Sequence, residues 1–60
     1  MFVEFDRRQN DGLIVSLELD RETGKPRIVV EDAWDEGEIA VTVPGASAAD
    51  AFRHPFRYLP

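Results

Sequence analysis

The sequence has no cysteine, no long hydrophobic run and no signal-peptide pattern, and each absence excludes a class of protein. Without cysteine, the 60-residue chain cannot be stabilised by disulfide bonds in the way that small secreted domains are. No segment approaches the roughly 20 consecutive apolar residues that cross a bilayer. The first residues also lack the basic and apolar regions of a signal peptide. We therefore expect a cytoplasmic protein that does not enter a membrane.

Basic residues are also few. The chain carries 12 acidic and 7 basic side chains, which give a net charge of −5 at pH 7. Sequence-independent binding to nucleic acid depends on basic groups that displace phosphate counterions, and anionic membrane surfaces attract the same groups. The charge balance therefore argues against direct binding to nucleic acid and against binding to a membrane surface.

Motifs of catalysis and cofactor binding are missing as well. Neither Ser16 nor Ser47 lies in a nucleophile motif, the glycines do not form a phosphate-binding loop, and no ligand cluster for a structural zinc is evident. A chain of this size also has little room to enclose a substrate pocket of ordinary dimensions. We expect no enzymatic activity, no cofactor and no metal.

The sequence instead contains three turns of one shape, each between segments in which apolar and polar residues alternate. Glycine ends each turn and supplies the positive φ angle that joins two antiparallel strands without strain. The turns are Asn10-Asp11-Gly12, Glu22-Thr23-Gly24 and Asp35-Glu36-Gly37. They predict one domain over residues 1–60 that contains a four-stranded antiparallel meander. The predicted strands lie near 1–8, 13–20, 27–34 and 38–43.

The apolar residues share one face of this sheet only in one register, because a slip of one residue reverses every side chain. A three-residue first turn sets Phe5 opposite Leu17. Even-numbered loops after it set Leu17 opposite Val30, and Val30 opposite Val43. The resulting apolar face is the predicted core: Val3, Phe5, Leu13, Val15, Leu17, Leu19, Ile28, Val30, Trp34, Ile39, Val41 and Val43.

The sequence after the sheet predicts one helix. Pro44-Gly45 ends the last strand. Ser47 is a typical helix N-cap, with Asp50 three residues later, and Pro55 disfavours helical geometry at His54. We expect a C-terminal helix near 47–54 that packs on one face of the sheet, so the predicted fold class is α+β. A small SH3-like barrel is the alternative, because the chain length and the number of strands suit it too.

Two single residues are candidates for chemistry. Asp32 is expected on the core face, between Val15 and Val41, with Arg7 on the same face. A carboxylate buried there needs a partner, so we favour an ion pair that clamps the C-terminal segment to the sheet over a tuned acid. His54 follows Asp50 by four residues and could orient with it toward a metal, but a role at the helix end is favoured.

Arginine and aromatic residues alternate near the C-terminus. Arg53 and Arg57, with Phe56 and Tyr58, are of the types that line single-strand-binding surfaces. Two arginines are a weak basis for that function in an acidic chain. We expect the aromatic rings to fill the core and the arginines to lie at the negative end of the helix dipole.

Two surfaces carry the functional predictions. On the outward face of the sheet, Ile14, Ala33 and Ala40 are expected to be cross-strand neighbours, with charged residues around them. A small apolar patch with a polar rim is typical of a modest protein interface, although arginine stems can also cover such a patch. The second surface is acidic and contains Glu31, Asp35, Glu36 and Glu38. It is either a solvated hairpin or a binding patch for a basic partner.

Stability supports self-association. Burial of apolar surface contributes on the order of 90 kcal/mol for a chain of this mass, and ordering its residues costs about the same. We therefore predict a small acidic cytosolic protein-interaction module with no catalytic activity. It would self-associate through the face of Ile14, Ala33 and Ala40 or through an edge strand. The alternative is an acidic inhibitor that mimics nucleic acid and binds a DNA- or RNA-binding protein through Glu31, Asp35, Glu36 and Glu38.

Overall fold

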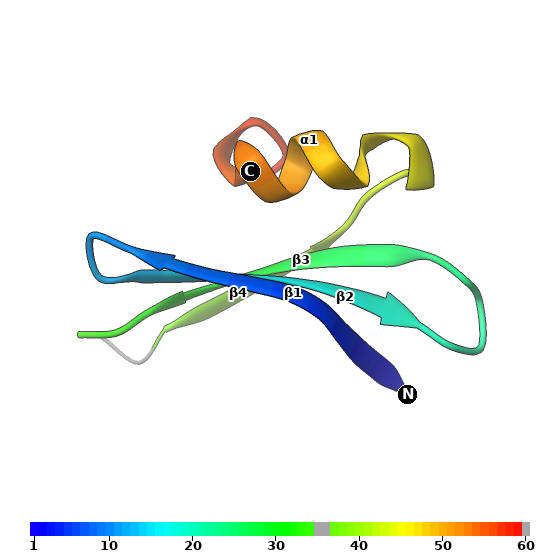
Figure 1. Ribbon diagram of the computed structural model, residues 1–60, viewed down its shortest axis with the longest axis horizontal. Helices are drawn as coiled ribbons and strands as arrows, with labels where there is room; N and C mark the ends of the chain where they lie inside the picture. The colour runs from blue at the N-terminus through cyan, green and yellow to red at the C-terminus, as the bar shows by residue number, and fades with distance from the viewer. Residues whose placement is uncertain (35–36, 60) are drawn as a thin grey trace.

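The alternating segments form an open antiparallel sheet, and the C-terminal residues form a helix above one of its faces (Figure 1). The computed structural model describes residues 1–34 and 37–59. The elements are β1 (Phe2–Asn10), β2 (Leu13–Asp20), β3 (Pro26–Asp32), β4 (Glu38–Thr42), the 3₁₀ turn η1 (Gly45–Ser47), α1 (Ala48–Arg53) and the 3₁₀ turn η2 (Pro55–Arg57). The strand order is β1-β2-β3-β4, so β1 and β4 are the sheet edges. The α+β meander is confirmed, and the alternative of a closed barrel is wrong.

The first hairpin has a two-residue turn. Asp11 and Gly12 both have positive φ, 52° and 79°, which is the signature of a type I′ turn. Asn10 consequently pairs with Leu13. The prediction of a three-residue turn is wrong, because Asp11 tolerates the left-handed region and the tighter turn matches the twist of the strands.

A β-bulge at Phe5 follows from this turn. The two-residue turn sets Asp6 opposite Leu17, whereas Val3 still lies opposite Leu19. One extra residue in β1 reconciles the two registers, and that residue is Phe5. The side chain of Phe5 is 66% exposed, so its predicted place in the core is wrong.

Two aspartates change the other registers. Asp20 Oδ1 accepts the Glu22 N–H at 2.9 Å, and Asp32 Oδ1 accepts the Trp34 N–H at 2.8 Å. Such side chains mimic a backbone turn and compete with strand pairing. β3 therefore ends at Asp32, two residues earlier than predicted, and Trp34 lies outside the sheet with 77% of its surface exposed.

The observed cross-strand partners differ from the predicted ones by an even number of residues. Leu17 pairs with Ile28 rather than Val30, and Val30 pairs with Ile39 rather than Val43. An even shift keeps each side chain on its face. The predicted pairs are therefore wrong. The predicted division between a core face and an outward face is nevertheless confirmed for β2, β3, β4 and the part of β1 before the bulge.

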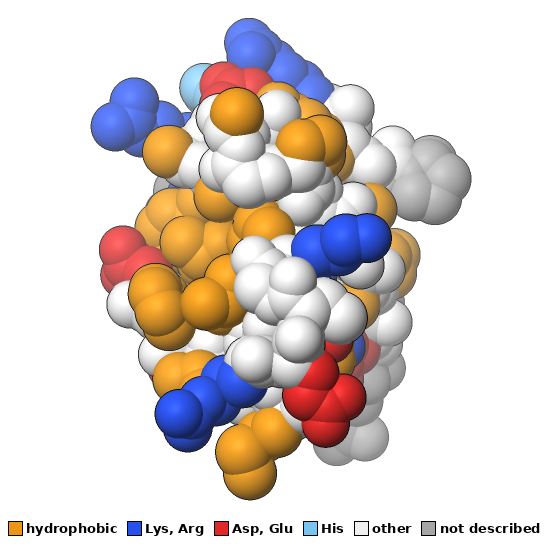
Figure 2. Space-filling view, turned by 90° about the vertical axis from the view of Figure 1, so that its right-hand side faces the viewer, with side chains coloured by type: hydrophobic (Ala, Val, Ile, Leu, Met, Phe, Trp, Pro, Cys, Tyr) orange, Lys and Arg blue, Asp and Glu red, His pale blue; other side chains and the backbone are white. Residues whose placement is uncertain are grey.

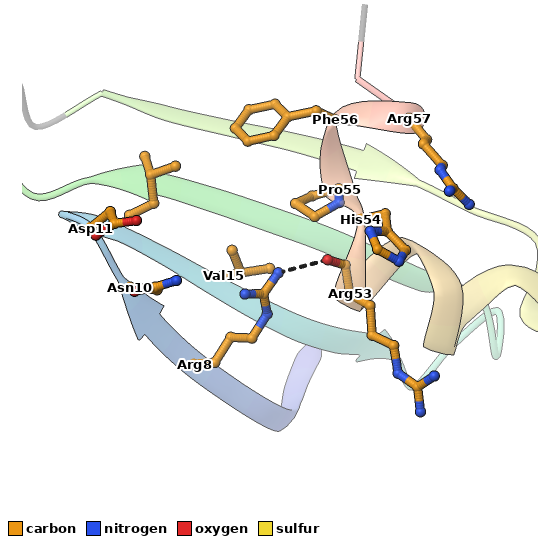
Figure 3. A pocket seen from close by; sticks show the side chains of 10 residues that line it. Arg8, Asn10, Asp11, Val15, Arg53, His54, Pro55, Phe56 and Arg57 are labelled. Atoms are coloured by element: carbon orange, nitrogen blue, oxygen red, sulfur yellow. Dashed lines mark hydrogen bonds between the residues drawn. The ribbon is translucent and has the colours of Figure 1, made fainter.

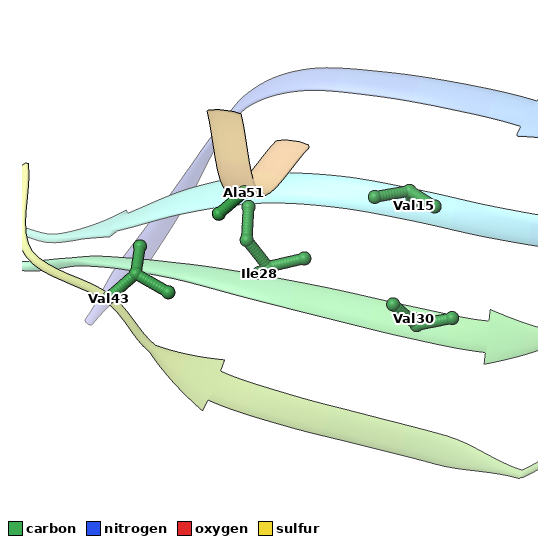
Figure 4. Close-up of a cluster of buried hydrophobic side chains, with 5 residues drawn as sticks. All are labelled: Val15, Ile28, Val30, Val43 and Ala51. Carbon is green, nitrogen blue, oxygen red and sulfur yellow. The ribbon is translucent and has the colours of Figure 1, made fainter. Parts of the chain in front are cut away.

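The core lies between the helix and the two central strands (Figure 4). Its buried residues are Val15, Ile28, Val30, Val43 and Ala51, with Leu13, Leu17, Val41, Phe52, Tyr58 and Leu59 packed around them. Six residues make a helix about 9 Å long, which covers only the middle of a molecule 32 Å long. Ile39, placed in the core by its pattern, is 53% exposed for this reason.

The helix begins and ends where the sequence predicts. Ser47 is the N-cap residue of α1, but the structure shows no side-chain capping hydrogen bond for it within the described residues; η1 precedes the helix instead. His54 leaves helical geometry, with φ −132° and ψ 63°, directly before Pro55. Within residues 1–34 and 37–59, neither this helix nor any other has the length and apolar character required to cross a membrane.

Candidate functional site

The helix leaves an apolar groove beside the edge strand β1. α1 packs mainly against β2 and β3, and the surface between it and β1 stays open. A hollow of about 210 Å³ there is lined largely by apolar residues: Phe5, Leu17, Leu19, Pro26 and Ala48, together with Glu18, Gly24 and Gly45. Figure 2 shows hydrophobic side chains gathered in the hollow between the helix above and the sheet below. We call this hollow the β1 groove.

A second hollow continues the β1 groove along the helix. It measures about 470 Å³ and shares Leu17 with the groove. Its other lining residues are Asp6, Arg8, Ala49, Phe52 and Arg53. The opening between β1 and α1 is therefore apolar near Phe5 and becomes charged toward the C-terminal end of the helix.

Arg8 joins the end of the helix to β1. Its Nε and Nη2 donate to the Phe52 carbonyl oxygen at 3.1 and 2.9 Å, and Nη2 also donates to the Arg53 carbonyl oxygen at 3.0 Å. The last carbonyls of a helix have no partner within the helix, and a cation there favours the helix dipole. A clamp between sheet and C-terminal segment does exist, but Arg8 forms it through carbonyl groups.

The arginine on the core face is Arg8, and not Arg7 as the sequence predicted. Arg7 was expected opposite Val15; the structure places Arg8 opposite Val15 and Arg7 opposite Ser16. The two-residue turn is the reason, because it displaces the register by one residue. The dipeptide Asp11-Gly12 was the available signal, since this pair favours a type I′ turn.

A third hollow lies between the C-terminal end of α1, η2 and the first hairpin (Figure 3). We call it the C-terminal cleft; its volume is about 480 Å³. Its lining residues are Arg8, Asn10, Asp11, Leu13, Val15, Arg53, His54, Pro55, Phe56 and Arg57. Three of the seven basic residues of the chain line it, with Asp11 as the one acidic residue of this lining. The cleft is therefore positive in a protein of negative net charge.

Asp50 organises the segment that carries this charge. Its Oδ2 accepts the Tyr58 hydroxyl at 2.8 Å, and Arg57 Nη1 lies 3.3 Å from its Oδ1. The Tyr58 hydrogen bond, and after it the positive charge of Arg57, lower the pKa of the Asp50 carboxyl. The His54 backbone N–H donates to the Asp50 carbonyl oxygen at 2.8 Å. These contacts connect α1 to the residues that follow it.

Of the residues proposed for metal or acid–base chemistry, Asp50 and His54 lie one helical turn apart, whereas Asp32 lies at the end of β3. Asp32 is half-buried opposite Leu13, so its predicted position between Val15 and Val41 is wrong, because β3 pairs in a different register. His54 is exposed and lines the C-terminal cleft, whereas Asp32 does not line it. Among residues 1–34 and 37–59, no group of three potential metal ligands is positioned to hold an ion.

Part of the outward face of the sheet is covered by its own side chains, while Ala33 and Ala40 are exposed. Val29, at its centre, is 2% exposed. Next to it, the Arg27 guanidinium lies 3.4 Å from the centroid of the Phe2 ring and its Nη2 lies 2.7 Å from Glu18 Oε1. Arg27 therefore covers the part of this face that carries Phe2.

The three predicted patch residues do not form one cross-strand row. Ile14 pairs with Glu31, and Ala40 pairs with Val29. Ala33 follows β3, and its N–H donates to the Gly12 carbonyl oxygen at 2.8 Å. The prediction that Ile14, Ala33 and Ala40 are cross-strand neighbours is wrong, because β3 pairs with β2 and β4 in a different register. Their role in binding a partner stays a prediction.

The acidic run is only partly described. Glu31 and Glu38 are paired residues on β3 and β4, on the outward face. Asp35 and Glu36 lie outside the described residues. The sequence predicts Glu31 and Glu38 as members of an acidic run, but not as cross-strand partners. Phe5, which the pattern places in the core, and Arg8, which no pattern singles out, line the opening beside the helix.

Comparison of the chain with protein-family models, with curated protein sequences and with solved structures returned no match.

Proposed function

We propose that the protein is an interaction module that self-associates through the N-terminal half of β1 and the β1 groove. One observation carries the proposal: Phe5, an aromatic residue with 66% of its surface exposed, lies at an apolar groove on an edge strand. An edge strand presents unpaired backbone groups that can pair with another chain. A cytosolic location and the absence of catalytic activity belong to the same proposal.

The bulge limits the contact to one half of β1. Residues after the bulge are polar or charged, from Asp6 to Asn10, and charged edge residues oppose strand pairing. Of the residues before it, Met1 and Phe2 are apolar and exposed, although the Phe2 ring lies against the Arg27 guanidinium on the outward face, and Glu4 is charged. The contact therefore centres on Phe5 and the groove.

In a two-fold symmetric dimer, Phe5 and the β1 groove of each copy both take part in the contact. In an isologous dimer each contact occurs in both directions, so Phe5 of each copy packs against Leu17 and Leu19 of the other. Full burial of one such side chain contributes about 1.5–3 kcal/mol. For a chain whose own stability is marginal, this contribution is a substantial fraction of the total.

Replacement of Phe5 tests the proposal. We expect Phe5→Ser to shift the protein toward the monomer in light scattering coupled to size-exclusion chromatography, because it removes the apolar contact while leaving the exposed position compatible with folding. Phe56→Ser is the matched control: Phe56 is equally exposed but lines the C-terminal cleft. A wild-type chain that is monomeric at all accessible concentrations would contradict the proposal. A monomer produced by Ala33→Arg, with Phe5→Ser unchanged, would assign the interface to the outward face.

An acidic inhibitor that mimics nucleic acid is the second proposal. Glu31 lies directly opposite Glu38, and like charges at opposed positions destabilise a sheet. A basic partner would relieve this repulsion. Such binding weakens steeply with salt, whereas an apolar contact through Phe5 does not, so the salt dependence of complex formation separates the two functions.

A further inference from the structure

The C-terminal cleft combines a cationic rim with an apolar floor. Arg53 and Arg57 are exposed on the rim, and Leu13, Val15 and Pro55 form the floor. Figure 3 shows the Phe56 ring on the side of the helix end that faces the first hairpin, whereas the side chains of Arg53 and Arg57 extend to its other side. This site is separate from the β1 groove, which none of these residues lines.

The positive charge of the rim is available to a ligand. Arg8 donates to carbonyl oxygens, which carry no net charge, so its charge still acts on the cleft. The ion pair between Arg57 and Asp50 is open to solvent, with 66% and 44% of the two side chains exposed, and pairs of this kind contribute little. An anionic group that enters the cleft therefore meets several arginines and one acidic lining residue, Asp11.

Phe56 is held in its exposed position. It lies within η2, where the Tyr58 and Leu59 N–H groups donate to the Pro55 carbonyl oxygen at 3.0 and 3.2 Å, and Pro55 itself is buried. The sequence pattern predicts that this ring fills the core, yet 66% of the residue is exposed. An anchored, exposed aromatic residue beside arginines is the composition of energetically dominant interface sites.

The shape of the opening favours an extended ligand. A volume of about 480 Å³ lies within the range of ligand sites. The second hollow lies next to the cleft, and Arg8 and Arg53 line both. A peptide segment can place one side chain in the cleft and its neighbours along the rim.

We propose that the C-terminal cleft binds an acidic peptide segment of a partner protein. An apolar side chain of the peptide packs on Leu13, Val15 and Phe56. Flanking Asp or Glu residues contact Arg53 and Arg57 by charge-assisted hydrogen bonds. Charge complementarity selects this occupant, because the rim of the cleft is positive on a protein that otherwise repels anions.

Selection from a library of random peptides tests the proposal on the full chain. We expect enrichment of peptides in which acidic residues flank an apolar one. Fluorescence anisotropy should then show that the double variant Arg53→Gln/Arg57→Gln weakens their binding by about tenfold or more, and that Phe56→Ser weakens it as well. Arg21→Gln, which makes one of the same charge changes at an exposed position of the β2–β3 loop, should bind as the wild type.

Several results would overturn the proposal. These are the absence of enrichment, enrichment of neutral or basic sequences, and equal binding by the wild type and the double arginine variant. Exclusive binding of a fatty acid such as decanoate would instead assign the cleft to a small amphiphile. Phe5→Ser should keep its peptide affinity, so failure of the self-association proposal and failure of this one give different results.

Discussion

At Gly12, backbone geometry and side-chain packing both require the absence of a Cβ atom. The φ angle of 79° lies in the left-handed region, which costs other residues about 1–2 kcal/mol. A Cβ atom would also lie 2.4 Å from Cη2 of Trp34, whose ring covers this turn. The turn thus determines where the exposed Trp34 rests.

We predict that Gly12→Ala destabilises the protein more than Gly24→Ala does. Gly24 has a similar φ of 74°, but a Cβ atom there would meet nothing within 4 Å, so its replacement costs only backbone strain. Chemical denaturation measures both free energies of unfolding. The fluorescence of the single tryptophan should change in Gly12→Ala alone; equal stability and equal spectra of the two variants would show that the ring contact is unimportant.

Asp50 makes the stability of the C-terminal segment dependent on acid. Its pKa is lowered below the ordinary 3.8, first by the Tyr58 hydroxyl and then by Arg57. A carboxyl with a lowered pKa in the folded state stabilises that state fully above its ordinary pKa, and this stabilisation is lost as the pH falls through the lower folded value. The loss therefore begins below about pH 4.

Tyr58→Phe should raise the pKa of Asp50 toward its ordinary value and reduce the loss of stability in acid. An NMR titration of the side-chain carboxyl carbons measures this shift. Asp20 provides the internal reference: its pKa is also lowered, chiefly by the Glu22 N–H, and it should not move in the variant. An unchanged Asp50 titration would mean that Tyr58 does not donate to it in solution.

At the scale of elements, α1 is too short to be stable by itself, and its position depends on contacts with the sheet. Isolated helices of fewer than about 12 residues are marginal in water, and α1 has six residues. Ala51 is fully buried against the sheet, and Arg8 binds the carbonyl end. The sheet therefore holds the helix in the place that leaves the β1 groove and the C-terminal cleft open.

We predict that Arg8→Lys lowers the free energy of unfolding by about 1–2 kcal/mol. One ammonium group cannot reproduce the planar donation to the Phe52 and Arg53 carbonyl oxygens. Arg7→Lys is the neighbouring control on the opposite face, and we expect it to change stability by less than about 0.5 kcal/mol. Urea denaturation of both variants checks this; equal stability would remove Arg8 from the attachment of the helix.

The element types could be predicted from sequence, whereas their pairing could not. The alternation of apolar and polar residues located all four strands, and Ser47 and Pro55 located the helix ends. The predicted pairs next to the turn were wrong in all three hairpins, whereas Val3 lies opposite Leu19 as the pattern predicts. Asp11 accepted a positive φ, and the side chains of Asp20 and Asp32 bonded to backbone N–H groups two residues later. Each of these local interactions has a free energy comparable with that of one backbone hydrogen bond between strands. The alternation of apolar and polar residues therefore does not determine which register forms.

For the molecule as a whole, the apolar surface and the two charged surfaces proposed for binding lie at different places. The β1 groove is apolar, the C-terminal cleft is positive, and Glu31 and Glu38 lie on the outward face. Self-association through the groove would couple folding to concentration. The melting temperature of the wild type should therefore rise with protein concentration, as a second measurement of the Phe5 prediction, and that of Phe5→Ser should not.

The sequence by itself determined the class of fold, because apolar alternation and glycine turns specify which segments are strands and which faces are buried. Tertiary structure alone decided which of those residues are exposed. A bulge placed Phe5 at the surface, a two-residue turn brought Arg8 to the helix end, and a six-residue helix left the two proposed binding sites uncovered. The physical reason is that the alternation of apolar and polar residues determines the face of the sheet on which a side chain lies. Whether that side chain is exposed depends on how far the short helix extends over the sheet.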